Sequence, residues 1–435
     1  MILILTHAVP KTMKIFPFKH SIVTLFFLLA WQISFAKFIL IPMDENQHNH
    51  LKAYGIVYKA LQKHIKVKWL LNYRGGSFLL PYDPEIKDEC QIRGVDFEII
   101  SEDQAAEILK TISSPAKNMD AVTLEKAPKI AVYSPKNKMP WDDAVTMVLK
   151  YAEIPYDVVY DEEVLQNKLL KYDWLHLHHE DFTGQYGRFY GAFRTAPWYI
   201  KRKAEQEALA HKLGFKKVSQ LKLAVAKKIK DYVTGGGFMF AMCSATDSFD
   251  IALAADGVDI CEPMFDGDPS DPDYQNKLDY SKTLAFTGFV LEPNPMVYEF
   301  SNIDTTNKRH IPRETDYFEL NQFSAKWDPV PTMLTQDHTI MIKGFMGQTT
   351  AFDRKLIKPN IIILAENKLN GEARYIHGTK GKGMFTFYGG HDPEDYSHRV
   401  GDPKTELDLH PTSPGYRLIL NNVLFPAAKR KHKKT

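Results

Sequence analysis

Cysteine is scarce in this sequence, and net charge is nearly absent. Three cysteines in 435 residues do not make a disulfide framework, because an odd number leaves at least one thiol unpaired. A pairing of Cys90 with Cys261 would leave Cys243 free. The chain carries 55 Lys and Arg residues against 53 Asp and Glu residues, a formal net charge of +2. Its charge therefore gives no indication of a nucleic-acid partner.

The chain also lacks an internal repeat of solenoid length. Hydrophobic residues make up 44% of it, charged residues 25% and aromatic residues 12%. These fractions are typical of a folded globular protein and exclude a disordered or fibrous one. The length leaves room for about two or three domains. The basic run at 429–435 is predicted to be a solvated terminal tail.

The N-terminal segment has the layout of a secretory signal peptide. Basic residues precede the apolar stretch 22–31, and the small residues Ser34 and Ala36 follow it. The apolar stretch is too short for a comfortable bilayer span. We therefore expect residues 1–36 to be removed and the mature chain to start at Lys37. The protein would be exported to the periplasm or the extracellular space, without a stable membrane span; a membrane-anchored N-terminus is the alternative.

Hydrophobic periodicity predicts an α/β protein with a small N-terminal α/β unit and a larger domain. Residues 37–126 contain strand patterns around a helix pattern at 50–63 and end in a polar linker at 113–126. From 127 to 428, buried strand patterns alternate with amphipathic helix patterns. This alternation implies a flavodoxin-like, mostly parallel sheet with helices on both faces. Between about 256 and 359 the alternation stops, and we expect an insertion of loops and short strands over the sheet.

One cysteine occupies a position suited to nucleophilic chemistry. Cys243 follows the apolar strand pattern 238–242 and precedes a predicted helix at 248–255. Ligands of parallel sheets collect at the carboxyl ends of strands, where backbone N–H groups and a helix dipole can lower a thiol pKa and bind an oxyanion. We expect Cys243 to be the nucleophile, with the backbone N–H near Ser244 stabilising the oxyanion. The alternative is a buried structural cysteine.

A histidine with nearby acids follows the strand pattern at 383–388. His391 would reach the same edge of the sheet as Cys243, and Glu394 follows shortly after it. An imidazole between a thiol and a carboxylate can take the thiol proton and return it to a leaving amine. The pattern therefore predicts a triad of Cys243, His391 and Glu394. The alternative is that His391 and its acids only cap the final helix or bind solvent.

A histidine-rich strand end provides further candidate ligands. Alternation places His176 and His178 on one face of the strand pattern 173–178, and His179 and Glu180 follow at its end. Two imidazoles and a carboxylate could hold a Zn²⁺-like ion. The same side chains could instead line an oxyanion or substrate pocket.

Four carboxylates lie close together in the predicted insertion, within residues 266–273. They are Asp266, Asp268, Asp271 and Asp273. Carboxylate oxygens are the hard ligands that Ca²⁺ prefers, although this spacing is not that of an EF-hand. A solvated turn built from Asp, Gly and Pro is the alternative.

The motifs of the larger domain resemble those of a known superfamily. The strand-end cysteine in FMFAMCSATD and the late His391-Asp392-Pro393-Glu394 are similar to the elbow cysteine and the His-Pro-Glu motif of class I glutamine amidotransferase-like domains, here with one residue inserted. The hairpin RYIHGTKGKGMFTFYGGHD is more similar to the ThuA (trehalose-utilisation) branch of that superfamily, which need not carry the cysteine. The whole mature chain is also similar to an exported Bacteroidetes family that bears the label asparagine synthetase B.

The resemblance implies an exported thiol-dependent amidase or hydrolase acting on glutamine or another carboxamide. The ThuA-like branch implies instead a carbohydrate-processing or sugar-binding domain whose histidines contact ligand or metal. The family label implies asparagine synthetase activity, but no segment matches a Ser-Gly-Gly-x-Asp-Ser ATP loop and Lys37 is not a cysteine. A non-catalytic envelope protein is the remaining alternative. The expected partner is a small amide or sugar, the only cofactors that the residues suggest are Ca²⁺ and Zn²⁺, and the oligomeric state stays open.

Overall fold

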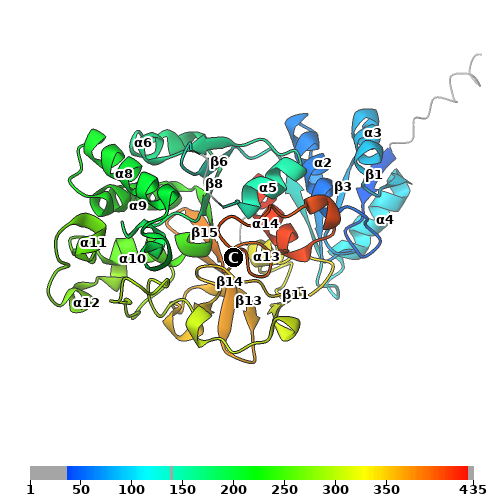
Figure 1. The fold of residues 1–435 in the computed structure, drawn as a ribbon. Helices are drawn as coiled ribbons and strands as arrows, with labels where there is room; N and C mark the ends of the chain where they lie inside the picture. Colours follow the sequence, from blue (N-terminus) through cyan, green and yellow to red (C-terminus); the bar gives the residue numbers. More distant parts are fainter. Residues whose placement is uncertain (1–36, 138–140, 430–435) are drawn as a thin grey trace, which may run out of the picture.

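The computed structural model describes residues 37–137 and 141–429. The predicted signal peptide, 1–36, and all but the first residue of the basic tail lie outside the described residues. Within these ranges, no helix is both long and apolar enough to cross a membrane. Two sheets organise the chain, one of five strands and one of ten. Figure 1 shows the N-terminal unit, coloured blue to cyan, beside the larger domain.

The first sheet belongs to the N-terminal unit and is antiparallel, with strand order β4-β1-β3-β2-β5. Its elements are β1 (Lys37–Ile41), α2 (His50–Gln62), β2 (Val67–Leu71), β3 (Ser77–Pro81), α3 (Pro84–Arg93), β4 (Glu98–Ser101), α4 (Glu102–Ser113) and β5 (Asp120–Leu124). The linker predicted at 113–126 therefore contains a strand. Val122 and Leu124 alternate with polar residues there and are buried, so β5 completes the sheet beside β2.

The second sheet is mixed, with strand order β11-β10-β13-β14-β15-β9-β8-β6-β7 and β12 paired to β14. Its strands are β6 (Ile130–Tyr133), β7 (Asp157–Val159), β8 (Trp174–His178), β9 (Phe238–Met242), β10 (Tyr317–Leu320), β11 (Met341–Lys343), β12 (Phe352–Asp353), β13 (Ile362–Asn367), β14 (Glu372–Lys380) and β15 (Gly383–Tyr388). Among the described strands, parallel pairing joins five neighbours, in the order β15, β9, β8, β6 and β7. The predicted mostly parallel sheet is thus only partly parallel, because tight turns such as residues 381–382 between β14 and β15 allow only antiparallel pairing.

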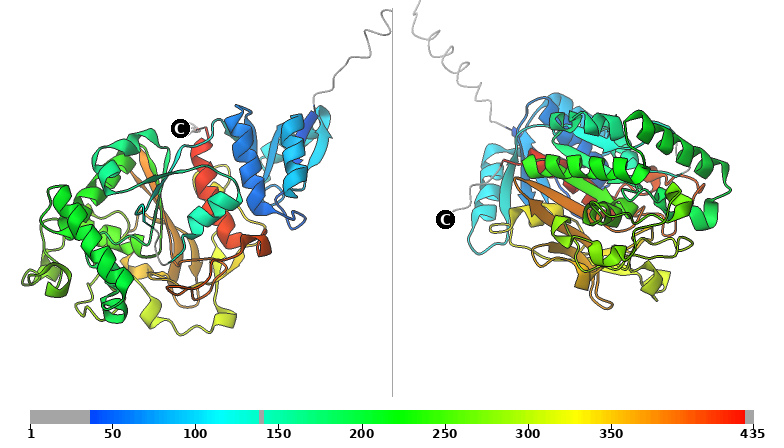
Figure 2. Two further views of the ribbon diagram at one scale, coloured as in Figure 1. Left: turned by 45° about the horizontal axis from the view of Figure 1, so that its top comes forward. Right: turned by 90° about the vertical axis from the view of Figure 1, so that its left-hand side faces the viewer.

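Helices cover both faces of the second sheet. They are α5 (Ala144–Tyr151), α6 (Asp161–Leu165), α7 (Tyr190–Phe193), α8 (Pro197–Lys212), α9 (Val218–Gly235), α10 (Asp247–Ala254) and α14 (Pro414–Leu424). Alternation along β8 puts Trp174 in one core with α5 and α14, and Leu175 and Leu177 in another with α9 and α10. Helix α2 packs against α14 and joins the first core, so the N-terminal unit is anchored on that face (Figure 2).

Several helices begin at side chains that accept their first free N–H groups. Asp83 accepts the N–H of Ile86 at the start of α3 (3.0 Å), and Asp143 accepts the N–H of Thr146 at the start of α5 (2.8 Å). Such N-caps satisfy backbone donors that the helix itself leaves unpaired. The second carboxylate oxygen of Asp143 faces His176 and His178 at the end of β8.

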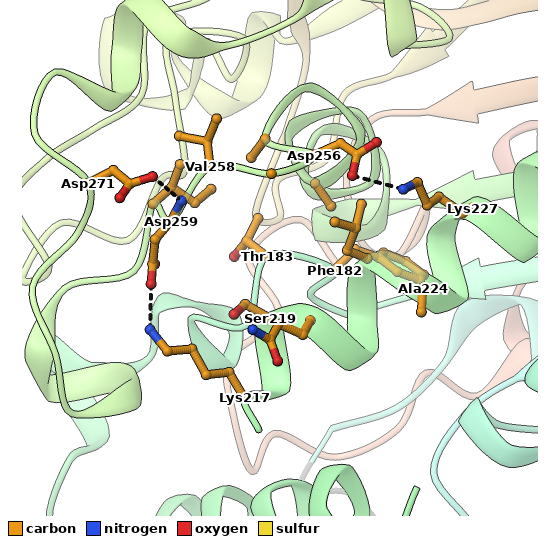
Figure 3. Close-up of a pocket in the computed structure, with 16 residues that line it drawn as sticks. Phe182, Thr183, Lys217, Ser219, Ala224, Lys227, Asp256, Val258, Asp259 and Asp271 are labelled. Carbon is orange, nitrogen blue, oxygen red and sulfur yellow. Dashed lines mark hydrogen bonds and ion pairs between the residues drawn. The ribbon is translucent and has the colours of Figure 1, made fainter. Parts of the chain in front are cut away.

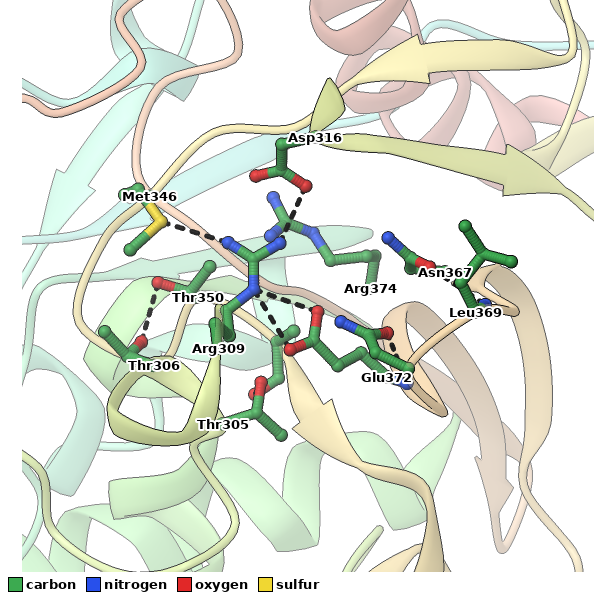
Figure 4. Close-up of polar contacts among 12 residues, drawn as sticks. Thr305, Thr306, Arg309, Asp316, Met346, Thr350, Asn367, Leu369, Glu372 and Arg374 are labelled. Atoms are coloured by element: carbon green, nitrogen blue, oxygen red, sulfur yellow. Dashed lines mark hydrogen bonds and ion pairs between the residues drawn. The ribbon is translucent and has the colours of Figure 1, made fainter. Parts of the chain in front are cut away.

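The predicted insertion is partly built into the sheet. Residues 256–359 supply β10, β11 and β12 and the short helices α11 (Pro263–Asp266), α12 (Tyr274–Lys277) and α13 (Pro329–Leu334). The Arg309 guanidinium ties this segment to β14 by an ion pair with Glu372 Oε2 (2.9 Å) and pairs within the segment with Asp316 Oδ1 (2.7 Å), as Figure 4 shows. The expectation of loops lying over the sheet is corrected in this respect, because β10 pairs with β13 and β11 with β10.

All three cysteines are free and buried. Cys90 belongs to the core that includes the N-terminal unit, whereas Cys261 belongs to the core under α9 and α10. The Cys261 thiol donates to the carbonyl of Thr183 (3.3 Å). The suggested pairing of Cys90 with Cys261 is therefore wrong, because the two thiols lie in separate cores.

Buried neutral histidines are expected to make the fold sensitive to acid. Burial lowers the pKa of His377 to about 4, and burial together with the Arg417 charge lowers the pKa of His50 to about 2. Below about pH 6.5 the unfolded chain protonates these imidazoles and the folded chain does not. Stability that is present above that pH is therefore lost as the pH falls toward the folded pKa values.

The free energy of unfolding of the parent chain should be lower at about pH 4 than at about pH 7. In His377→Gln we expect this fall to be smaller by about 3 kcal/mol. Urea unfolding at the two pH values measures that difference. His211→Gln is the matched control, because His211 is exposed on α8 and its loss should leave the pH dependence unchanged. If His377→Gln and the parent chain lost the same stability in acid, the burial argument would be wrong.

Candidate functional site

The ends of three neighbouring strands form the candidate site. β15, β9 and β8 are adjacent and parallel, so their carboxyl ends share one edge of the sheet. His178 closes β8, Cys243 follows β9 directly, and His391 follows β15 after two glycines. One ligand atom from each of His178, His179, Cys243 and His391 lies within 4.8 Å of the other three. The structure thus brings Cys243 and His391 together at the predicted edge.

Cys243 occupies a strained strand-to-helix corner. Its φ is +53°, in the left-handed region that residues with a Cβ seldom adopt. The chain turns there from β9 into the short 3₁₀ helix η3 (Cys243–Ala245) and then into α10. The Cys243 carbonyl fixes the corner by accepting the N–H (3.0 Å) and the hydroxyl (2.7 Å) of Thr246. Strain of this kind collects at functional sites.

The Cys243 thiol is protonated at rest. It is 4% exposed, and burial raises its pKa to about 12, although the backbone N–H groups of Ser244 and Gln348 face the sulfur and favour the thiolate. Two converging N–H groups are donors suited to an oxyanion. The sequence indicated the donor at Ser244. It gave no signal for Gln348, which reaches the site from the segment between β11 and β12.

His391 is a neutral imidazole with a free nitrogen. Burial and the nearby His178 and His398 hold its pKa well below the ordinary value. Its ring stacks on that of His398, with centroids 4.5 Å apart. Among the described residues, its Nε2 has no hydrogen-bond partner. A neutral imidazole has one unprotonated nitrogen, which can accept the proton of a neighbouring thiol.

Glu394 does not complete the predicted triad. Its carboxylate lies 3.1 Å from Nδ1 of His410. The turn after His391 is fixed by Asp392, whose carboxylate accepts the N–H of Glu394 (2.9 Å) and the hydroxyl of Thr405 (2.8 Å). This turn carries Glu394 toward His410. We therefore correct the expected orienting role of Glu394.

His179 has a tautomer fixed by the backbone. Its Nε2 lies 2.8 Å from the carbonyl oxygen of Asp142, and a carbonyl can only accept a hydrogen bond. Nε2 must therefore carry the proton, which leaves Nδ1 as an acceptor. Burial, together with His178 and His391, holds the pKa of His179 well below its ordinary value. The site thus contains a second neutral imidazole besides His391.

Asp143 is a site residue that the sequence analysis missed. Its Oδ2 lies 3.1 Å from His176 Nε2 and 3.3 Å from His178 Nδ1. Although burial alone would raise it, these two imidazoles hold the pKa of the Asp143 carboxyl well below its usual range. The histidines do share one face of β8, as alternation predicts. In the sequence, an aspartate just before a helix indicates an N-cap. That pattern gives no indication that the same carboxylate also contacts two histidines.

Glu180 is held by Lys222 of α9 and Arg202 of α8, and it is not part of the histidine and cysteine cluster. Its carboxylate accepts the hydroxyl of Tyr160 (3.3 Å) and lies 3.6 Å from Lys222 Nζ and 3.7 Å from Arg202 Nη2. Burial raises its pKa. Left-handed backbone at His179, with φ +54°, ends the strand alternation and sends the next side chain to the other face. The expected placement of Glu180 beside the histidines is corrected accordingly.

The donor set at the strand ends fits a Zn²⁺-like ion. Imidazole nitrogens and a thiolate sulfur are ligands that zinc binds in tetrahedral sites. His391 Nε2 and the Nε2 of His178 lack hydrogen-bond partners within the described part of the chain. Asp143 would stand behind His178 as the carboxylate that orients a ligating imidazole. His176 and His178 also form a possible ligand group with the Asp143 carboxylate, whereas Glu180 belongs to neither group.

The acidic cluster of the insertion faces a lysine. Lys217 Nζ makes ion pairs with Asp259, Asp266 and Asp268. Asp271 accepts the N–H of Asp259 (3.0 Å), and Asp273 accepts the side-chain N–H of Asn276 (2.7 Å). Figure 3 shows Lys217 with Asp259 beside a pocket of about 510 Å³. Of the four carboxylates, Asp266 and Asp268 thus have the Lys217 ammonium as their positive partner, while Asp271 and Asp273 bond to other groups.

Comparisons with known proteins return solved structures alone. No family model and no curated protein matches the chain. Cytoplasmic protein STM3548 from Salmonella typhimurium is similar to 69% of this chain over 100% of its own, with 10% identity and a TM-score of 0.34. Cytoplasmic protein STM1381 from Salmonella typhimurium LT2 has the same coverage, with 13% identity and a TM-score of 0.33. Similarity at this level carries no argument about activity.

Both of these proteins are described as cytoplasmic, in contrast to the exported protein predicted from residues 1–36. Export is not part of the proposals that follow.

Proposed function

We propose that this chain is a thiol-dependent hydrolase or amidase whose nucleophile is Cys243. The observation that carries the proposal is the left-handed Cys243 corner within 4.8 Å of ligand atoms of His179 and His391. A nucleophile held at a strand end, a base within reach and two N–H donors beside the sulfur are the parts that acyl transfer requires.

The proposed reaction uses the neutral thiol and imidazole pair. On binding of a carboxamide, the Cys243 S–H proton passes to His391 Nε2 and the sulfur attacks the carbonyl carbon. The N–H groups of Ser244 and Gln348 stabilise the oxyanion. The C–N bond breaks as His391 returns the proton to the amine, which leaves a thioester; water then cleaves the thioester to release the acid and restore the thiol.

A second candidate function is supported by the free histidine nitrogens. The same cluster could hold a Zn²⁺-like ion, with Cys243 as a ligand rather than a nucleophile. The chain would then act as the ThuA-like alternative implies, as a carbohydrate-processing or sugar-binding domain. The two candidates differ in whether the thiol is free.

We expect iodoacetamide to alkylate Cys243 faster than Cys90 or Cys261. Both of those thiols are 0% exposed, whereas Cys243 is 4% exposed and lies beside two bases. Timed labelling of the folded chain followed by peptide mass spectrometry gives the three rates. The generic acyl donor 4-nitrophenyl butyrate should likewise leave a butyryl group on Cys243 alone. Ester cleavage with equal labelling of all three thiols would rule out Cys243 as the nucleophile.

Elemental analysis of the same preparations separates the two candidates. Under the thiol-hydrolase proposal, Cys243 reacts without chelator and zinc is substoichiometric. Stoichiometric zinc that disappears in Cys243→Ser, with a thiol that alkylates only after chelation, would establish the metal-binding alternative instead.

A further inference from the structure

A buried arginine beside the candidate site has unsatisfied donors. Arg202 lies on α8 and is 5% exposed. None of its three guanidinium nitrogens has a hydrogen-bond partner among the residues that the structure describes. A guanidinium offers five N–H donors in a fixed fork. Burying such a group without hydrogen bonds is costly, which points to a ligand that supplies them.

The surrounding ion pairs leave these donors unused. Lys222 and Arg202 share the carboxylate of Glu180, at 3.6 and 3.7 Å. Asp161 is committed to Lys222, whose ammonium donates to both of its oxygens (3.1 Å each). Arg202 thus has the Glu180 charge at 3.7 Å, but the described residues offer it no acceptor oxygen in hydrogen-bond range.

Aromatic rings connect Arg202 to the thiol. The guanidinium lies over the Trp141 ring, 5.0 Å from its centroid. The Trp141 ring lies 5.8 Å from that of His179, which belongs to the Cys243 cluster. Tyr298 lies close enough to Cys243 and Arg202 for the charge of either group to shift its pKa. Part of the Tyr298 side chain is exposed (41%).

We propose that Arg202 binds the carboxylate of an acidic acyl substrate whose reactive carbonyl lies at Cys243. A carboxylate can accept two parallel N–H groups from the guanidinium fork, which fixes orientation as well as charge. The Trp141 ring would hold the guanidinium plane in place. This inference rests on the proposed function for the role of Cys243, but the anion site itself does not need a reactive thiol.

The test uses adipate as an acidic probe and adipamide as its uncharged counterpart. We expect titration calorimetry to show adipate binding to the full chain and to Cys243→Ala, with adipamide weaker by about tenfold or more. Arg202→Met should weaken adipate binding by at least about tenfold. Arg202→Lys, which keeps the charge and loses the fork, should fall between. Arg194→Met is the matched control, because Arg194 is exposed just before α8, and it should bind adipate as the parent does.

The outcomes separate this inference from the proposed function. If adipate binds through Arg202 but no acyl group forms on Cys243, the anion site stands and the hydrolase proposal fails. Equal adipate affinity in Arg202→Met and the parent, or no adipate binding to the folded parent, would overturn the anion site. Circular dichroism of each variant verifies folding, and Arg202→Lys decides the matter if Arg202→Met does not fold.

Discussion

Replacement of Cys243 by alanine is expected to lower kcat/KM for 4-nitrophenyl butyrate by at least about 10⁴-fold, since removing one member of a catalytic set costs about that much or more. The fold should persist, because alanine keeps the Cβ and loses only a largely buried sulfur. Kinetics of ester cleavage beside thermal unfolding of the same variant measure both effects. Cys90→Ala provides the control, since it removes a buried thiol on α3 of the N-terminal unit.

Variants of His391 and Glu394 then test which groups assist the Cys243 thiol. His391→Gln should lose turnover to a similar degree, because a nitrogen of its imidazole lies within 4.8 Å of the sulfur and is the proposed base. Glu394→Gln should leave turnover essentially unchanged, because that carboxylate pairs with His410. A large loss in Glu394→Gln with full activity in His391→Gln would contradict the geometry argued here. Retention of activity in Cys243→Ala would point to the histidines alone or to a bound metal.

The position of the candidate site follows from the sequence because parallel strands share an edge. Apolar runs at 238–242 and 383–388 mark buried strands, and their ends must meet if the strands are neighbours. The structure pairs β9 with β15 in parallel, and so Cys243 and His391 converge. Alternation along β8 likewise fixes which histidines share a face.

Partners that depend on turns or on distant side chains could not be predicted in this way. Glu394 moves to His410 because Asp392 holds a local turn, and no periodicity reports such a turn. The carboxylates at 266–273 resemble a cation site in the sequence. In the structure, Lys217 at the start of α9 pairs with Asp266 and Asp268. The hairpin of β14 and β15 was predicted from its glycine turn, but the antiparallel pairing of β10, β11 and β13 was not, since strand patterns do not reveal direction.

The largest loss of stability is expected when Lys222 is replaced by methionine, at about 3–5 kcal/mol. The Lys222 side chain is 1% exposed and donates to Tyr133, Tyr160 and Asp161 at 3.0–3.1 Å. Burial disfavours its charged form, but Asp161, Tyr160 and Glu180 raise the pKa of Lys222 above its ordinary value. Methionine matches the stem and removes the ammonium, which leaves buried carboxylates without their cation.

A surface pair on the same helix provides the comparison. Lys227 pairs with Asp256 at 2.8 Å, but its side chain is 51% exposed, so Lys227→Met should cost no more than about 1 kcal/mol. Urea unfolding of both variants measures the contrast. The double variant Lys222→Met/Asp161→Asn should recover at least about 1 kcal/mol, because the stranded charge is then gone. Equal losses of stability in Lys222→Met and Lys227→Met would contradict the expected cost of leaving buried carboxylates without their cation. Since Glu180 divides its attraction between Lys222 and Arg202, loss of Lys222 also turns Glu180 toward Arg202, where it competes with an incoming carboxylate.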